Sequence, residues 1–66
     1  MYKIVFRFYE NDDNGGFEYV GRKTVENVKK EEIEAKKEEI LREFCGFYTE
    51  INIYDEKGNL VPFGEV

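Results

Sequence analysis

The chain has 66 residues, of which 17% are aromatic and 38% charged, and its net charge is -5. A chain of this length forms one small domain that buries only about 60% of its unfolded surface, which leaves little room for a large enclosed active site. The acidic balance disfavours binding to a phosphate backbone, which depends on neutralisation by Lys and Arg, and it favours a protein partner with a basic surface.

The residue inventory excludes several kinds of site. The chain contains no His and no Ser, so nucleophilic catalysis by a triad or dyad that uses an imidazole is excluded. With no His and one Cys, zinc lacks its usual ligands. We therefore expect no enzyme activity, no catalytic residues and no cofactor. Cys45 lies between Phe44 and Gly46, where we expect a small buried packing residue.

The chain carries no clear signal for export or membrane insertion. A single cysteine cannot form an internal disulfide, and secreted domains of this size usually depend on disulfides. The apolar residues 1–9 are interrupted by Lys3 and Arg7, no small-residue cleavage site follows them, and no run approaches the length of a membrane span. We expect a complete, soluble chain in the cytoplasm.

The first predicted element is a strand over residues 2–10, because apolar and other residues alternate with a period of two. One face carries Tyr2, Ile4, Phe6 and Phe8, and the other face carries Lys3, Val5, Arg7 and Tyr9. Residues 11–16 contain no apolar side chain and include an Asn-Gly step, which predicts a hairpin turn. Residues 17–23 then form the returning strand, with a bulge at Gly21.

The loop over residues 10–15 is rich in carboxylate and amide oxygens, which are ligands that calcium accepts. Its spacing does not match an EF-hand, and no distal bidentate Glu is in place. We interpret the loop as a polar turn and predict no metal site.

Residues 25–45 form the predicted helix, since Ile33, Ile40 and Phe44 fall on one line at helical spacing. Thr24 is the preferred N-cap, with Asn27 as the alternative, and Gly46 supplies a left-handed residue that ends the helix. The opposite side carries an acidic helix row, which we define as Glu31, Glu34 and Glu38. A row of this kind is usually a solvated face, although it could also meet a basic groove in a nucleic-acid-handling protein.

A second hairpin follows the helix. Residues 47–54 alternate between Phe47, Thr49, Ile51 and Ile53 on one face and Tyr48, Glu50, Asn52 and Tyr54 on the other. Residues 55–59 are a turn with Gly58 at the left-handed position, and residues 60–66 return as a strand. Pro62 lacks an amide donor, so this last strand should be short or irregular.

The expected fold is therefore a single α+β domain over residues 1–66, with ββαββ order and one helix packed on one face of a four-stranded sheet. The order of elements is similar to that of β-grasp domains, a resemblance of topology that implies no function. The first strand is expected inside the sheet. The pattern leaves open whether it pairs in parallel with the last strand or antiparallel with the third.

The uncovered sheet face is the second candidate surface, beside the acidic helix row. Its candidate contact residues are Lys3, Val5, Arg7, Tyr9, Tyr48 and Tyr54. Tyr and Arg are enriched in interface hot spots. The sequence thus favours a small non-enzymatic protein-interaction module, such as an inhibitor or regulator of the type encoded by phages and mobile elements. The alternative is a single-stranded nucleic-acid-binding domain that uses the aromatic sheet face, and a homodimer through this face would also enlarge the core.

Overall fold

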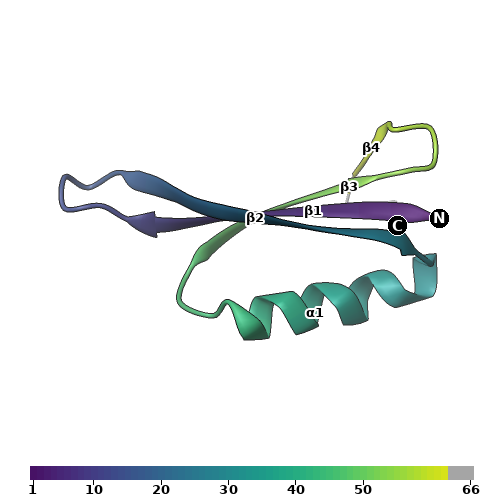
Figure 1. Cartoon of the computed structure of the whole chain (residues 1–66), viewed down its shortest axis with the longest axis horizontal. Helices are drawn as coiled ribbons and strands as arrows, with labels where there is room; N and C mark the ends of the chain where they lie inside the picture. The colour runs from purple at the N-terminus through teal and green to yellow at the C-terminus, as the bar shows by residue number, and fades with distance from the viewer. Residues whose placement is uncertain (63–66) are drawn as a thin grey trace.

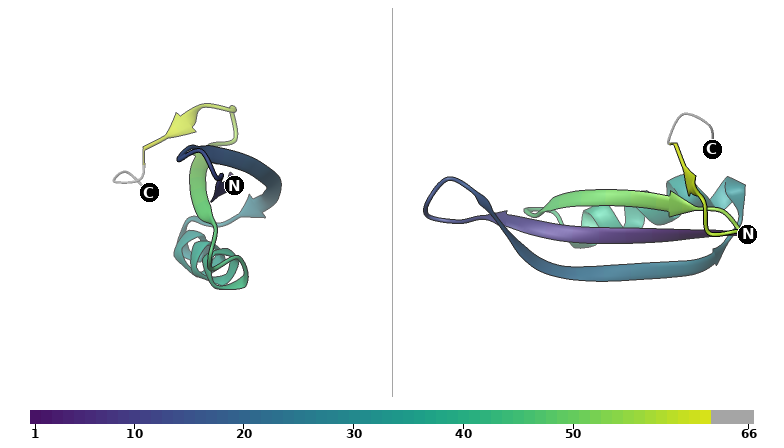
Figure 2. Two further views of the ribbon diagram at one scale, coloured as in Figure 1. Left: turned by 90° about the vertical axis from the view of Figure 1, so that its left-hand side faces the viewer. Right: turned by 90° about the horizontal axis from the view of Figure 1, so that it is seen from above.

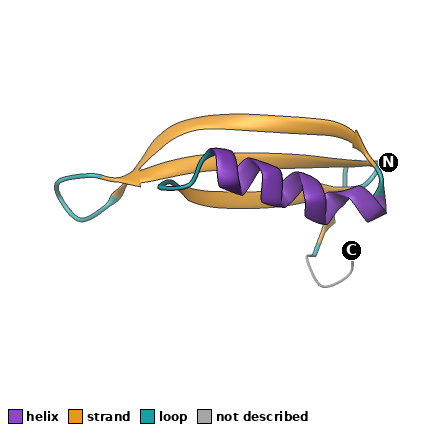
Figure 3. Ribbon diagram, turned by 90° about the horizontal axis from the view of Figure 1, so that it is seen from below, coloured by secondary structure: helices purple, strands orange, loops and turns teal. Residues whose placement is uncertain are grey.

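The structure, a computed structural model, describes residues 1–62 and confirms the α+β class (Figure 1). Its elements are β1 (Tyr2–Asn11), β2 (Phe17–Val28), the 3-10 turn η1 (Lys30–Glu32), α1 (Ile33–Glu43), β3 (Tyr48–Tyr54) and β4 (Leu60–Val61). The four strands form one sheet in the order β2-β1-β3-β4, and every pair is antiparallel. Helix α1 lies along one face of the sheet, as Figure 3 shows from below.

Strand β1 lies inside the sheet, as the sequence predicts, and it pairs antiparallel with β3 through Ile4 opposite Ile53 and Phe6 opposite Ile51. The pairing settles the choice that the sequence left open. The alternative, a parallel pair between the first and last strands, is not formed within residues 1–62. The similarity to β-grasp domains stays one of the order of elements along the chain.

The core lies between the sheet and α1. Its buried members are Ile4, Phe6, Phe8, Val28, Ile33, Ile40 and Ile53. The ring of Phe44, at the end of the helix, stacks on Phe8 with 4.2 Å between centroids. The helix phase predicted from Ile33, Ile40 and Phe44 is thus confirmed, and Ala35 on the opposite side is exposed.

The predicted start of the helix at residue 25, with Thr24 as its N-cap, is wrong. Strand β2 continues to Val28, because Val25 and Val28 pair with β1 and pack against the core. β-Branched side chains fit a half-buried strand better than a helix. Asn27, the alternative cap, adopts a left-handed φ of 57°. It lies where the β1–β2 register shifts, between the pairs Tyr2–Val28 and Ile4–Val25.

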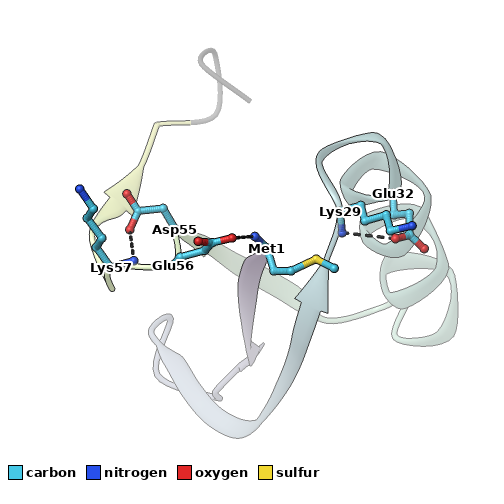
Figure 4. Close-up of polar contacts among 6 residues, drawn as sticks. All are labelled: Met1, Lys29, Glu32, Asp55, Glu56 and Lys57. Atoms are coloured by element: carbon cyan, nitrogen blue, oxygen red, sulfur yellow. Dashed lines mark hydrogen bonds and ion pairs between the residues drawn. The ribbon is translucent and has the colours of Figure 1, made fainter.

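The helix is introduced by η1, and Lys29 takes the position before it. The Lys29 amide donates to Glu32 Oε1 at 3.3 Å, and the Glu32 amide donates to the Lys29 carbonyl at 2.9 Å (Figure 4). A glutamate that reaches back to the preceding amide in this way satisfies a donor that the helix leaves unpaired. At the other end α1 stops at Glu43, two residues before the predicted end. Gly46 has the predicted left-handed conformation, with a φ of 101°, in the turn that follows, where the Phe47 amide donates to the Phe44 carbonyl at 3.2 Å.

Both hairpin turns are closed by an aspartate. Asp12 Oδ1 accepts from the amides of Asn14 and Gly16, and Asp55 Oδ1 accepts from the amides of Lys57 and Asn59. The predicted left-handed glycine of the second turn is present, and the first turn also has a left-handed Gly15. Of the predicted strand over residues 60–66, the structure shows β4, and residues 63–66 lie outside the described part of the chain.

The β1–β2 hairpin projects beyond the C-terminal end of α1, so its tip has no helix beneath it (Figure 1). The opposite end of the molecule is closed by contacts between the chain start and the β3–β4 turn, where the Met1 amino group pairs with Glu56 (Figure 4). We call the projecting part, residues 9–20, the hairpin end.

Candidate functional site

The face of the sheet opposite α1, which we call the open face, is turned toward the viewer in Figure 2, right. Residues directly opposite one another in antiparallel strands share a face. Lys3 lies opposite Tyr54, Arg7 opposite Glu50 and Tyr9 opposite Tyr48, so the third strand presents the same face that the sequence predicts. The structure therefore brings together the candidates of strands β1 and β3 in one surface.

Val5 belongs to this face by its place in the strand but is only 8% exposed. It lies in the central strand, between Thr24 of β2 and Asn52 of β3. The expectation that Val5 offers a contact surface is wrong, because a side chain with so little exposed area has little surface left to bury against a partner.

The polar side chains in the middle of the open face contact one another. Arg7 Nη1 lies 3.1 Å from Glu50 Oε1, and Asn52 Nδ2 donates to the same oxygen at 3.0 Å. The Lys3 ammonium lies 5.5 Å from the centroid of the Tyr54 ring, a cation–π distance. The candidates Lys3, Arg7 and Tyr54 thus already interact with their own chain.

The hairpin end of the open face holds a cluster of aromatic rings. Tyr9 packs edge-on against Tyr19 with 5.8 Å between centroids, and Phe17 packs edge-on against Tyr48 at 4.9 Å. Phe17 is 60% exposed, and Tyr19 and Tyr48 are each 54% exposed. We call these four residues the aromatic cluster.

Phe17 and Tyr19 were not among the candidates from the sequence. The sequence shows that Phe17 and Tyr19 share one face of their strand. Whether that face is the open face or the covered face depends on how the strand pairs with β1. Tyr9 pairs with Tyr19, and Phe8 pairs with Gly21. Val20 is therefore the extra residue of a bulge, one position before the bulge predicted at Gly21. The Tyr9–Tyr19 pairing places Tyr19 on the open face.

A shallow groove of about 290 Å³ runs along the aromatic cluster. It is lined by Tyr9, Phe17, Tyr48, Thr49 and Glu50. Both polar contacts of Glu50 use Oε1, and no contact to Oε2 is present within residues 1–62. The groove thus combines aromatic walls with one carboxylate oxygen that has capacity for another donor.

The hairpin end and the middle of the sheet differ in charge. Residues 9–20 contain four carboxylates and no Lys or Arg. Glu10 lies directly opposite Glu18 on the other face of the hairpin from Tyr9 and Tyr19, an arrangement of like charges that destabilises a strand pair. In the middle of the sheet Arg22 lies opposite Arg7, so two positive charges are neighbours there.

The acidic helix row is exposed, as predicted, but the helix balances part of its charge. Glu34 pairs with Lys37 at 3.1 Å, and Glu39 pairs with Lys36 at 3.9 Å. Both are i,i+3 pairs along the helix. The helix face is therefore mixed in charge and has the character of an ordinary solvated surface.

The remaining chemical candidates yield no site. Cys45 is exposed, so the expectation of a buried packing residue is wrong. Within the described residues no three His, Cys, Asp or Glu side chains are grouped to hold a metal, and Asp12 instead closes the hairpin turn. Among those same residues, no helix has the length and apolar character needed to cross a bilayer.

Comparison of the chain with protein-family models, with curated proteins and with solved structures gave no match.

Proposed function

We propose that this chain is a small non-enzymatic protein-interaction module, of the inhibitor or regulator type, that binds a protein partner through the hairpin end of its open face. The observation that carries the proposal is the aromatic cluster, of which Phe17, Tyr19 and Tyr48 are 54 to 60% exposed. Contiguous exposed aromatic surface marks interaction sites on small proteins. Tyr and Trp are also the rings that most often anchor hot spots.

The proposal favours the open face over the acidic helix row for two reasons. Desolvation of large rings supplies affinity, whereas exposed charges mainly raise the association rate. The helix row also has part of its charge paired on its own surface, through Glu34 and Lys37. A partner that used that row would have to compete with Lys37 for Glu34.

The test compares two variants with equally exposed residues at opposite ends of the molecule. Phe17 and Leu60 are each 60% exposed. The double variant Phe17→Ser, Tyr48→Ser should lose a partner that the wild-type chain captures by crosslinking in cells, and Leu60→Ser should retain it. Circular dichroism should show that both variants are folded. Equal capture by the double variant and the wild type would refute the proposal.

A second candidate, single-stranded nucleic-acid binding, is favoured by one observation. Arg22 is exposed and lies beside Arg7 on a face with several aromatic rings, which can stack bases. The acidic hairpin end works against it. This function requires binding to a labelled single strand that weakens steeply as salt is raised and is reduced by Arg22→Gln. No binding at low salt would remove it.

A further inference from the structure

The two edges of the sheet differ in how far they are protected. Strand β4 pairs with Ile53 and Tyr54, and within residues 1–62 no strand pairs with the outer edge of residues 48–52. Strand β2 forms the other edge and carries two register irregularities. Bulges and inward charges are the usual devices that prevent an edge from recruiting another strand. The exposed part of the β3 edge has no bulge, no Pro and no Lys.

The β3–β4 turn fixes which backbone groups point outward. The Asp55 amide donates to the Asn59 carbonyl at 2.9 Å, so residues 55 and 59 form a hydrogen-bonded pair. Hydrogen bonding alternates along an antiparallel ladder. Ile53, Ile51 and Thr49 therefore direct their backbone groups to the outer edge, and Ile51 and Thr49 lie beyond the reach of β4 within the described residues.

The groove along the aromatic cluster lies against the same part of β3, since Tyr48, Thr49 and Glu50 line it. A strand added at this edge would place alternate side chains beside Tyr48 and Glu50 on the open face. The chemistry there suits a long cation. Its aliphatic stem can lie on the rings, and its charge can reach Glu50 Oε2, which has no contact within residues 1–62.

We propose that the outer edge of β3 takes an extended segment of the protein partner as an antiparallel fifth strand, with a Lys or Arg side chain of that segment in the groove at Glu50. This proposal rests on the proposed function and names the chemistry of its partner. Backbone pairing supplies the docking, and alternate side chains supply the selectivity, as in strand addition generally. The apolar side chains of the segment then lie beside Thr49 and Ile51 on the other face.

The probe is the capped peptide acetyl-Thr-Val-Lys-Val-Arg-Val-Thr-amide, measured by calorimetry against the wild-type chain. Replacement of its Lys and Arg by Glu should weaken binding by about tenfold or more, because the hairpin end and Glu50 then repel it. Absence of binding by the parent peptide, or equal binding by the acidic peptide, would overturn the proposal.

Backbone methylation of the peptide distinguishes strand addition from adhesion of side chains. In the proposed register the Val amides donate to β3 and the Lys and Arg amides point to solvent. N-Methyl groups on the three Val residues should abolish binding, and N-methyl groups on Lys and Arg should leave it within about twofold. Equal effects of the two peptides would contradict the strand.

A protein variant tests the same edge from the other side. Thr49→Pro removes an outward amide and leaves the ladder to β1 intact, a position where a strand tolerates Pro. It should lose the peptide, and Thr49→Val, which keeps the amide, should bind it. If Thr49→Pro fails to fold, the methylated peptides decide the question without any change to the protein.

Hydrogen exchange on the isolated chain tests whether the β3 edge is instead covered by the chain's own C-terminal residues or by a second copy of the chain. The proposal predicts rapid exchange of the Thr49 and Ile51 amides. Protection that is lost when the chain is truncated after Pro62 would assign the edge to its own C-terminal residues, and protection that grows with protein concentration would assign it to a second copy. Either result overturns the proposal. If the ring variants lose a cellular partner but no peptide binds, the proposed function stands and the strand proposal fails.

Discussion

The two faces of the sheet are built from the same strands, but one packs against α1 and the other is left uncovered by the helix. On the covered face, β1 contributes Ile4, Phe6 and Phe8 to a core sealed by α1. On the open face, Arg7 of β1 is ion-paired with Glu50 in the middle of the sheet, and Tyr9 packs against Tyr19 at the hairpin end. The comparison teaches that the side chains that form the core are separate from those through which we propose that the chain binds a partner. Substitutions should therefore separate the two properties.

The largest expected effect on stability comes from the covered face. Ile40→Ala removes a side chain that is 3% exposed and leaves a cavity, which should lower the free energy of unfolding by about 2 to 5 kcal/mol. In a domain this small that is a large share of the total. Ala35→Glu on the exposed side of the same helix is the matched control and should cost little. Urea denaturation that ranked the two variants in reverse would show that the helix phase is wrong.

Val5 sharpens the comparison, because it is a buried residue on the open face. Val5→Ala removes two methyl groups and should lower the free energy of unfolding by about 1.5 kcal/mol. The measurement is urea denaturation beside Phe17→Ser, which should change stability by no more than about 0.5 kcal/mol because Phe17 is exposed. A larger loss for Phe17→Ser than for Val5→Ala would mean that the aromatic cluster serves folding.

The smallest expected effect is on the free energy of unfolding at acidic pH. The amide of Asn59 donates to Asp55 and lowers the pKa of that carboxyl below the ordinary 3.8. As the pH falls the unfolded chain then takes up this proton before the folded chain does, so the stabilisation present above pH 3.8 is lost as the pH falls through the folded pKa. The drop in unfolding free energy between pH 7 and pH 3 should be smaller in Asp55→Asn than in the wild type. An equal drop in both proteins would contradict this role of the turn.

The sequence was sufficient to predict the elements whose pattern is local. The alternation in β1 and β3 and the spacing of Ile33 and Ile40 each gave the correct face. It failed where one pattern fits two structures. Val25 and Val28 suit both an amphipathic helix and a strand, and only pairing with β1 decides between them.

The candidate site was predicted in part for the same reason. Tyr9 and Tyr48 follow from alternation within their own strands. The face of Tyr19 depends on a bulge that the sequence placed at Gly21 and the structure places at Val20. The burial of Val5 and the exposure of Cys45 depend on tertiary contacts, which no local pattern contains.

The most direct test of the central claim compares the open face with the acidic helix row in one binding experiment. Once a partner is identified, surface plasmon resonance should be run with Tyr48→Ala and with the triple reversal of Glu31, Glu34 and Glu38 to Lys. We predict that Tyr48→Ala weakens binding by about 2 kcal/mol or more, mainly through a faster off-rate. The triple reversal should change the on-rate and leave the off-rate near that of the wild type. Loss of binding in the charge reversal with Tyr48→Ala unaffected would show that the partner binds the helix and not the open face.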